Sequence, residues 1–344
     1  MNANDALAGT SALAVSLILV PLVSVGCKRF DLLDHPGPLK IHTHPVPRLG
    51  GIAIAAAVVA GVFVGRTAAL EHWPVLEAFA LLWLVGLIDD LRGLPPLPRL
   101  AAQAFSGLLL WYSGFGIPAH DRILGLAETV SIVVLFVNAW NMLDGADGLA
   151  AGVAAIAALA FFLRPASCGG SLGAFACALA GSCAGFLVFN LPPADIYLGD
   201  SGSTSLGLAL AVLTLDFYRS NDASPAVIVF PLLVAALPLV DGVFALIRRL
   251  RKAQSPLRGD RLHMYDLARE RGLSARQVAL ASYALTFLFA VLGVLALRYR
   301  PMLVLPIGVL TAITLVVLAV WLGCFSLDQT ASLQIRSKSA RGQT

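Results

Sequence analysis

About eleven apolar stretches, each long enough or nearly long enough to cross a bilayer as a helix, fill most of this chain and leave short polar gaps between them. Backbone amides must be hydrogen-bonded inside lipid, so such stretches span as helices. Only 13% of the 344 residues are charged, whereas a soluble domain carries about 25%. We therefore predict an all-α, polytopic integral membrane protein with about 11 transmembrane helices. They are expected near residues 6–26, 51–70, 73–88, 100–117, 123–138, 148–163, 171–190, 202–217, 225–247, 277–297 and 302–325.

The basic residues predict an orientation. If the stretches cross alternately, most of the 24 Lys and Arg residues fall on one side, including Lys28, Arg29 and a basic run from Arg248 to Arg276. Cytoplasmic loops carry the excess of Lys and Arg, so we expect the N-terminus outside and the C-terminus in the cytoplasm. The first stretch has no small-residue cleavage signature after it and is expected to be retained.

The domain organisation is simple. We predict a single transmembrane domain over residues 1–326 and a cytoplasmic tail over residues 327–344. Five polar gaps would then face the cytoplasm, near residues 28–50, 88–99, 138–148, 191–201 and 248–276.

Other features predict packing and membrane contact. The five cysteines are odd in number and lack CxxC spacing, so we expect small packing residues. The pairs Gly61xxxGly65 and Gly181xxxGly185 predict close approach of helices. The basic run that begins at Arg248 indicates contact with anionic membrane lipid, and no aromatic or motif signal supports nucleic acid as a partner.

Carboxylates and amides gather in the cytoplasmic gaps. An ionisable group within a membrane costs about 2.5 to 3.5 kcal/mol even on the lenient insertion scale, so its presence indicates function. The arrangement predicts an enzyme site at the membrane surface, where a charged, water-soluble substrate meets a lipid. The residues are Asp89, Asp90, Asn138, Asn141, Asp144, Asp147 and Asp200.

The first gap is rich in proline, which excludes helix and strand ladders and predicts a shaped loop. It also carries three histidines, which could suggest zinc, but no cysteine or carboxylate stands at ligand spacing. We prefer an anion-binding loop with Lys40 as its point charge.

The next two gaps predict a site for a metal ion and phosphate, and a purely structural role is the alternative for the aspartate pair. Adjacent Asp89 and Asp90 are tolerable when a divalent cation or a shared proton compensates their repulsion, although a solvated helix end would look the same. The gap from Asn138 to Leu149 offers hard oxygen ligands that suit Mg²⁺ or Mn²⁺, and its glycines allow close approach of a nucleotide.

Asp200 stands just before a helix that opens with small hydroxylated residues. The N–H groups and dipole there favour phosphate, with Asp200 on the bridging metal, while a plain N-cap is the structural alternative. The basic gap 248–276 could close over a polyanionic substrate.

Taken together and in order, the five gaps resemble the signature loops of the polyprenyl-phosphate N-acetylhexosamine-1-phosphate transferases, glycosyltransferase family 4. The resemblance runs from Asp34 to about Gly272. It implies transfer of a sugar 1-phosphate from a UDP-N-acetylhexosamine to undecaprenyl phosphate, with release of UMP and with Mg²⁺ or Mn²⁺ as cofactor. It also implies a multi-pass enzyme of the bacterial cytoplasmic (inner) membrane that initiates cell-surface polysaccharide synthesis. GlcNAc is the favoured sugar, another N-acetylhexosamine stays open, and so does a homodimer.

The resemblance also implies roles for matching residues. The aspartate pair would be catalytic and act on the lipid phosphate, the metal would be held by an amide and a carboxylate, and the remaining positions would bind substrate. The catalytic residues are Asp89 and Asp90; the metal ligands are Asn141 and Asp200; the substrate-binding residues are Lys40, His42, Asp144, Asp147, Arg261 and His263.

The chain departs from the family pattern in two loops. The usual Arg-Lys-x-His is Leu39-Lys40-Ile41-His42, so one cation is missing. The usual His-x-His-His is His263-Met264-Tyr265-Asp266, so two histidines are replaced. The loss argues against the peptidoglycan branch of the family, and we hypothesise that the replacements tune donor choice.

Two other classes remain as alternatives. A secondary transporter would place carboxylates near the bilayer midplane in two corresponding repeats. An intramembrane prenyltransferase would need a second aspartate-rich motif, which the chain lacks. For the transferase, direct attack is the preferred mechanism, with a covalent aspartyl intermediate as the alternative.

Overall fold

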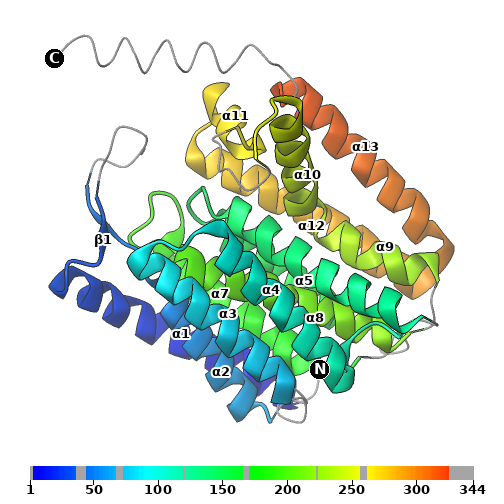
Figure 1. The fold of residues 1–344 in the computed structure, drawn as a ribbon, viewed down its shortest axis with the longest axis horizontal. Helices are drawn as coiled ribbons and strands as arrows, with labels where there is room; N and C mark the ends of the chain where they lie inside the picture. The colour runs from blue at the N-terminus through cyan, green and yellow to red at the C-terminus, as the bar shows by residue number, and fades with distance from the viewer. Residues whose placement is uncertain are drawn as a thin grey trace.

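The computed structural model describes residues 3–35, 44–66, 73–118, 121–165, 170–221, 224–255 and 262–324 (Figure 1). Most of these residues are helical. The helices are α1 (Ala3–Arg29), α2 (Gly50–Val64), α3 (Trp73–Arg92), α4 (Pro96–Leu110), α5 (Arg122–Leu143), α6 (Leu149–Leu163), α7 (Gly173–Asn190), α8 (Gly199–Arg219), α9 (Pro225–Val234), α10 (Ala236–Arg251), α11 (Met264–Glu270), α12 (Ala275–Tyr299) and α13 (Val304–Leu322). The π-helix η2 (Trp111–Phe115) extends α4, the 3₁₀ turn η4 (Pro301–Leu303) precedes α13, and β1 (Leu33–Asp34) pairs antiparallel with β2 (Val46–Pro47).

The predicted all-α membrane fold is confirmed. Each apolar stretch expected from the sequence coincides with a helix or a pair of helices. Among the described residues, five helices are long and apolar enough to cross a membrane, or six if the bent pair α9–α10 counts as one span. The larger number of eleven spans and the orientation of the termini stay predictions.

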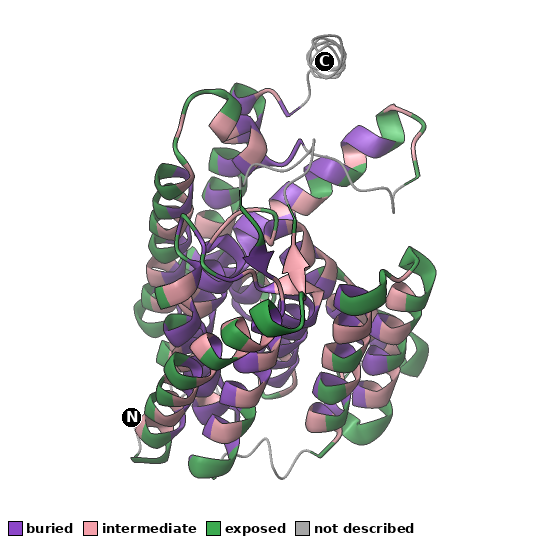
Figure 2. Ribbon diagram, turned by 90° about the vertical axis from the view of Figure 1, so that its left-hand side faces the viewer, coloured by how far each residue is buried: buried purple, intermediate pink, exposed green. Residues whose placement is uncertain are grey.

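Helix α8 forms the centre of the bundle. Every residue from Ser201 to Phe217 is buried, so α8 has no lipid-facing side. It packs against α3 and α5 most extensively and also against α2 and α6. Figure 2 shows the same division, with buried residues inside the bundle and exposed ones on the outer faces of the peripheral helices. The polar first turn of α8 is thereby held at a fixed place among its neighbours.

Glycines bring α1, α2 and α7 into close contact, as their spacing predicts. A Cβ at Gly181 would lie 2.1 Å from the carbonyl oxygen of Gly9, and one at Gly61 would lie 2.7 Å from the Cβ of Ala178. Close contacts of this kind at small residues are typical of helices that pack in lipid.

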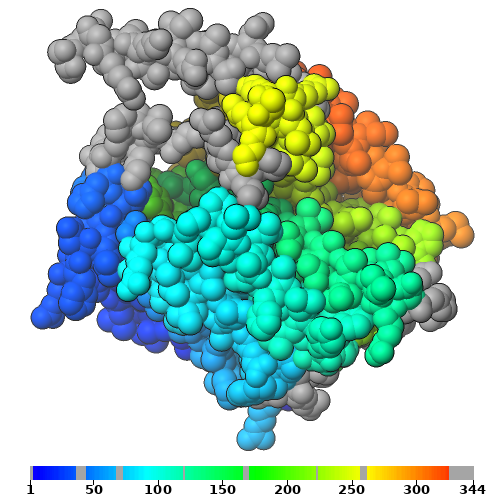
Figure 3. All heavy atoms as spheres, viewed as in Figure 1, coloured from blue at the N-terminus to red at the C-terminus, as the bar shows by residue number. Residues whose placement is uncertain are grey.

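The expected stretch 225–247 is not one straight helix. Helices α9 and α10 meet at Ala235 with a bend of 79°. Pro238 has no N–H to donate to the carbonyl of Val234, and Pro231 lies inside α9, so the helical ladder is interrupted at the bend. As a result, α10 stands steeply away from α9 in Figure 1. In the space-filling view, the yellow atoms of α10 and the orange α13 lie above the cyan and green surface of α3 to α5 (Figure 3).

Candidate active site

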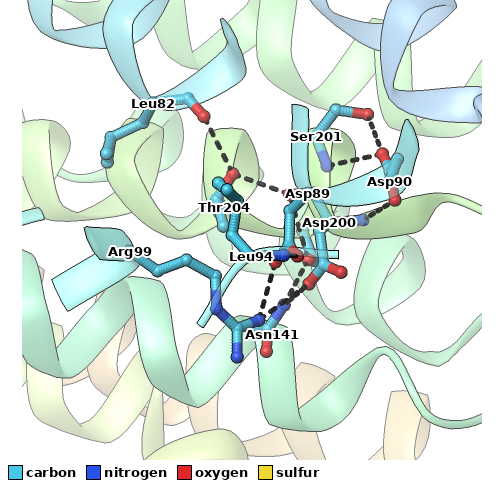
Figure 4. A network of polar contacts seen from close by, with 10 residues as sticks. Leu82, Asp89, Asp90, Leu94, Arg99, Asn141, Asp200, Ser201 and Thr204 are labelled. Carbon is cyan, nitrogen blue, oxygen red and sulfur yellow. Dashed lines mark hydrogen bonds and ion pairs between the residues drawn. The ribbon is translucent and has the colours of Figure 1, made fainter. Parts of the chain in front are cut away.

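The polar gaps meet at one end of the helix bundle. Asp89 and Asp90 lie in the last turn of α3, Asn141 near the end of α5, and Asp200 in the first turn of α8. Figure 4 shows these side chains gathered around the start of α8, although more than a hundred residues separate the first from the last. Alternating helices bring the ends of α3 and α5 to the same side as the beginning of α8.

Asp90 caps helix α8 from outside. Its Oδ1 accepts a hydrogen bond from the backbone N–H of Asp200 at 2.7 Å. Its Oδ2 accepts from the N–H of Ser201 at 3.0 Å and from the Ser201 hydroxyl at 2.7 Å. The residue is 8% exposed. Both carboxylate oxygens are thus bonded to the first turn of α8, where N–H groups lack partners within the helix.

Gly199 makes this cap fit. Its φ of +78° lies in the left-handed region. A Cβ there would lie 2.5 Å from the carbonyl oxygen of Arg48 and 2.8 Å from either carboxylate oxygen of Asp90. Only glycine combines that backbone conformation with the available space.

Asp89 is paired with Arg99, the last residue of the polar gap 88–99, to which no role was assigned from the sequence. The guanidinium Nη1 of Arg99 lies 2.8 Å from Oδ2 of Asp89 and 3.8 Å from Oδ1 of Asp200. The N–H of Leu94 donates to Oδ1 of Asp89 at 2.6 Å. Arg99 follows Pro96 in the first turn of α4, so its nearness to the aspartate pair in sequence was the available signal.

The two predicted metal ligands touch each other. The Asn141 amide donates to Oδ1 of Asp200, and also to the Ser203 hydroxyl at 3.0 Å. Among the described residues, no group of three or more His, Cys, Asp or Glu side chains is arranged to hold a metal ion. This donor set fits Mg²⁺, because Mg²⁺ commonly takes one or two carboxylates and completes its shell with water and substrate phosphate.

Asp144 and Asp147 lie on the turn between α5 and α6. Burial, followed by the nearby carboxylates of Asp200, Asp90 and Asp147, raises the pKa of Asp144 well above its ordinary value, and the Gly199 N–H opposes this rise. Burial and the neighbouring carboxylates both disfavour the charged form of Asp144, and a cation bound nearby would offset both effects. Asp147 accepts a hydrogen bond from the Ala194 N–H at 3.2 Å.

A pocket of about 690 Å³ opens beside this cluster. Its lining includes the carboxylates Asp144 and Asp147 and three arginines from separate segments, Arg48, Arg269 and Arg276. Arg269 and Arg276 belong to the basic gap 248–276, which was expected to close over a polyanionic substrate, whereas Arg48 was given no role from the sequence. Carboxylates together with arginines suit a ligand that carries both phosphate and hydroxyl groups.

Tyr197 also lines the pocket. Burial, then the carboxylates of Asp147 and Asp34, raise the pKa of the Tyr197 phenol to about 12. The phenol therefore stays neutral near pH 7 and can donate a hydrogen bond to a ligand.

The remaining predicted substrate-binding residues are placed differently. His263 is 5% exposed and is not among the residues that line the pocket. Its Nδ1 lies 2.6 Å from Oδ2 of Asp241 on α10. Asp241 was missed, although a lone carboxylate inside an apolar stretch is itself a signal. Lys40, His42 and Arg261 lie outside the described residues.

Comparison with known proteins identifies the family. Residues 72–218 match the sequence profile described as glycosyl transferase family 4. The decaprenyl-phosphate N-acetylglucosaminephosphotransferase of Mycobacterium leprae is 32% identical, over 81% of this chain and 80% of its own length. A probable undecaprenyl-phosphate N-acetylglucosaminyl 1-phosphate transferase of Bacillus subtilis is 31% identical, over 81% of each chain. An undecaprenyl-phosphate alpha-N-acetylglucosaminyl 1-phosphate transferase of Thermotoga maritima is 30% identical, over 79% of this chain and 85% of its own. The resemblance carried by the five polar gaps is confirmed, and the chain belongs to glycosyl transferase family 4.

Proposed function

We propose that this protein transfers N-acetylglucosamine 1-phosphate from UDP-GlcNAc to a polyprenyl phosphate, undecaprenyl phosphate, and releases UMP. The observation that carries the proposal is the carboxylate cluster at the start of α8, which adjoins a pocket lined by Asp144, Asp147 and three arginines. The names of the relatives, which pair a polyprenyl phosphate with N-acetylglucosamine phosphate, support the same reaction.

The pocket supplies the donor side of the reaction. Arg48, Arg269 and Arg276 would neutralise the pyrophosphate of the nucleotide sugar, since guanidinium groups bind phosphate oxygens in pairs. Asp144 and Asp147 would accept hydrogen bonds from the nucleotide or sugar. Phosphoryl transfer needs positioning and charge neutralisation more than covalent work from the protein, and this pocket offers both.

The Asp89–Arg99 pair would receive the acceptor. Arg99 is 32% exposed, so guanidinium donors beyond the one bonded to Asp89 can reach the lipid phosphate. An oxygen of that phosphate attacks the β-phosphorus of the donor, the bond to the α-phosphate breaks, and UMP leaves with the electron pair. Direct attack needs no covalent aspartyl intermediate, which stays the alternative.

Asn141 and Asp200 would hold Mg²⁺ or Mn²⁺, which when bound supplies positive charge to the pyrophosphate and the departing UMP. Asp90 has both oxygens engaged by α8, so we assign it to positioning Asp200, with Asp89 as the partner that faces the acceptor. Lys40, His42 and Arg261 remain predicted substrate-binding residues.

The enzyme is proposed to work in the bacterial cytoplasmic membrane. The N-terminus would lie outside, and the tail after residue 326 and the site would face the cytoplasm, where UDP-sugars occur. Transfer onto undecaprenyl phosphate would initiate a cell-surface polysaccharide, and a homodimer stays an open expectation.

A secondary transporter is the weaker reading. It would place the key carboxylates near the middle of the spans. Instead, Asp89 and Asp90 end α3, and Asp200 begins α8.

UMP release by the purified protein in detergent tests the proposal. We expect release with undecaprenyl phosphate and UDP-GlcNAc, its loss on adding EDTA, and its recovery with excess Mg²⁺. Parallel reactions with other UDP-N-acetylhexosamines identify the sugar, and a reaction without lipid controls for hydrolysis. Absence of lipid-dependent release with every donor would refute the proposal, and preference for another donor would correct the sugar.

A further inference from the structure

Asp241 is a buried carboxylate outside the cluster at the start of α8. It lies on α10 and is 3% exposed. Its Oδ2 lies 2.6 Å from Nδ1 of His263, and its Oδ1 accepts the backbone N–H of Met264 at 2.8 Å. Because an ionised carboxylate only accepts hydrogen bonds, Nδ1 carries the proton in this pair. One side chain thus ties two consecutive residues at the start of α11 to α10.

A second contact ties the same segment to the candidate site. The rings of His263 and Tyr265 stack with centroids 5.4 Å apart and planes 5° from parallel. The Tyr265 hydroxyl donates to the carbonyl of Met142 at 3.3 Å, and a Cβ on Gly145 would lie only 1.9 Å from that hydroxyl oxygen. The Tyr265 ring therefore rests directly on the turn that carries Asp144.

Helix α11 connects this contact to Arg269, another residue of the pocket lining. Leu267 is 1% exposed and packs with Phe244 and Leu322, which seats the helix against α10 and α13. Arg269, in the last turn of α11, lines the pocket that Asp144 also lines. The position of Arg269 relative to Asp144 is therefore set through the residues at the start of α11.

We propose that Asp241, His263 and Tyr265 form a positioning column that holds α11 against the Asp144 turn and so fixes the distance between Arg269 and Asp144 in the donor pocket. The inference rests on the proposed function, because it concerns the pocket assigned to the nucleotide sugar. His263 then acts through Nδ1 on Asp241 and does not touch the donor.

Two substitutions of His263 separate positioning from substrate contact. His263→Asn keeps an amide donor near the place of Nδ1, whereas His263→Gln places its amide near the place of Nε2. We expect the KM for UDP-GlcNAc to rise roughly tenfold or more in His263→Gln and less than about threefold in His263→Asn. The reason is that His263→Gln loses the hydrogen bond to the Asp241 carboxylate, whereas His263→Asn keeps it. In both variants, kcat and the KM for undecaprenyl phosphate should stay close to those of the unsubstituted protein.

Calorimetric titration with UDP-GlcNAc in the absence of lipid measures donor affinity independently of turnover. It should show weaker binding by His263→Gln than by His263→Asn. Glu270→Gln, at an exposed position on the same helix, is the matched control and should change neither quantity. The reverse order, with His263→Gln normal and His263→Asn impaired, would overturn the inference in favour of direct contact through Nε2. Equal effects of the two variants would overturn it as well.

A second pair of variants keeps the test decisive if the His263 variants do not fold. Tyr265→Phe keeps the stacked ring, and Tyr265→Ala removes it. The column predicts a raised KM for UDP-GlcNAc in Tyr265→Ala alone, and an unchanged KM in both would overturn it. Transfer by the unsubstituted protein reports separately on the proposed function, so the two failures are distinguishable.

Discussion

At the residue scale, adjacent aspartates have different surroundings and different tasks. Asp90 accepts hydrogen bonds from three donors of α8. Asp89 is paired instead with Arg99, whose guanidinium group also lies near Asp200. The sequence predicted that these carboxylates would gather, because alternating helices return their ends to one side. It could not separate the two tasks, because capping depends on the direction of each side chain.

Asparagine substitutions test this division. Asp90→Asn turns an amide N–H toward a backbone N–H, so we expect transfer to fall sharply and the free energy of unfolding to drop by about 1 to 3 kcal/mol. Asp200→Asn should abolish transfer while leaving stability unchanged or higher, because it relieves repulsion among carboxylates. Thermal unfolding in detergent, run beside the UMP assay, measures both. Equal destabilisation by the two variants would contradict the assignment.

Gly199 offers a second test with a built-in control. The alanine of Gly199→Ala must adopt a left-handed φ, and its Cβ collides with atoms of Arg48 and Asp90. We therefore expect the free energy of unfolding to fall by about 3 kcal/mol or more. Gly93 has a similar φ of +68° but nothing within 4 Å, so Gly93→Ala should cost only about 1 to 2 kcal/mol. Denaturation of both variants decides whether crowding at the cap adds to backbone strain.

At the scale of elements, hydropathy predicted the helices but not how they meet. It placed the stretches correctly, because apolar length alone determines them. It missed the bend between α9 and α10, since proline is tolerated in many membrane helices and its effect depends on neighbours. The sequence also could not show that the three arginines of the pocket converge, because their convergence arises only when separate segments pack together.

The contact of α1 with α7 gives a prediction at this scale. Gly181→Ala would press a methyl group against the backbone of Gly9, so α1 must shift. We expect the free energy of unfolding to fall by about 1 to 3 kcal/mol. Gly26→Ala, also within a helix but with nothing within 4 Å, should be neutral or stabilising by up to about 1 kcal/mol. Matching melting temperatures for the two variants would argue against backbone contact between these helices.

At the scale of the whole molecule, the proposed orientation is the prediction to test. Arg92 is the last residue of α3 and Arg300 directly follows α12, and both are exposed. The proposed topology places them on opposite sides of the membrane. The four cysteines within the described residues are buried, which keeps background labelling there low. Arg92→Cys should react with a membrane-impermeant maleimide in inverted vesicles and not in intact cells, and Arg300→Cys should do the opposite. The reverse pattern would invert the topology.

The burial of α8 has a consequence for biosynthesis. Because α8 contacts no lipid in the assembled protein, it must pass from the insertion machinery directly into a site formed by neighbouring helices. Four helices that surround it, α2, α3, α5 and α6, are all synthesised before it. These helices can therefore form the packing site before α8 is synthesised. Asp90, at the end of α3, is then available to accept the N–H groups of the first turn of α8.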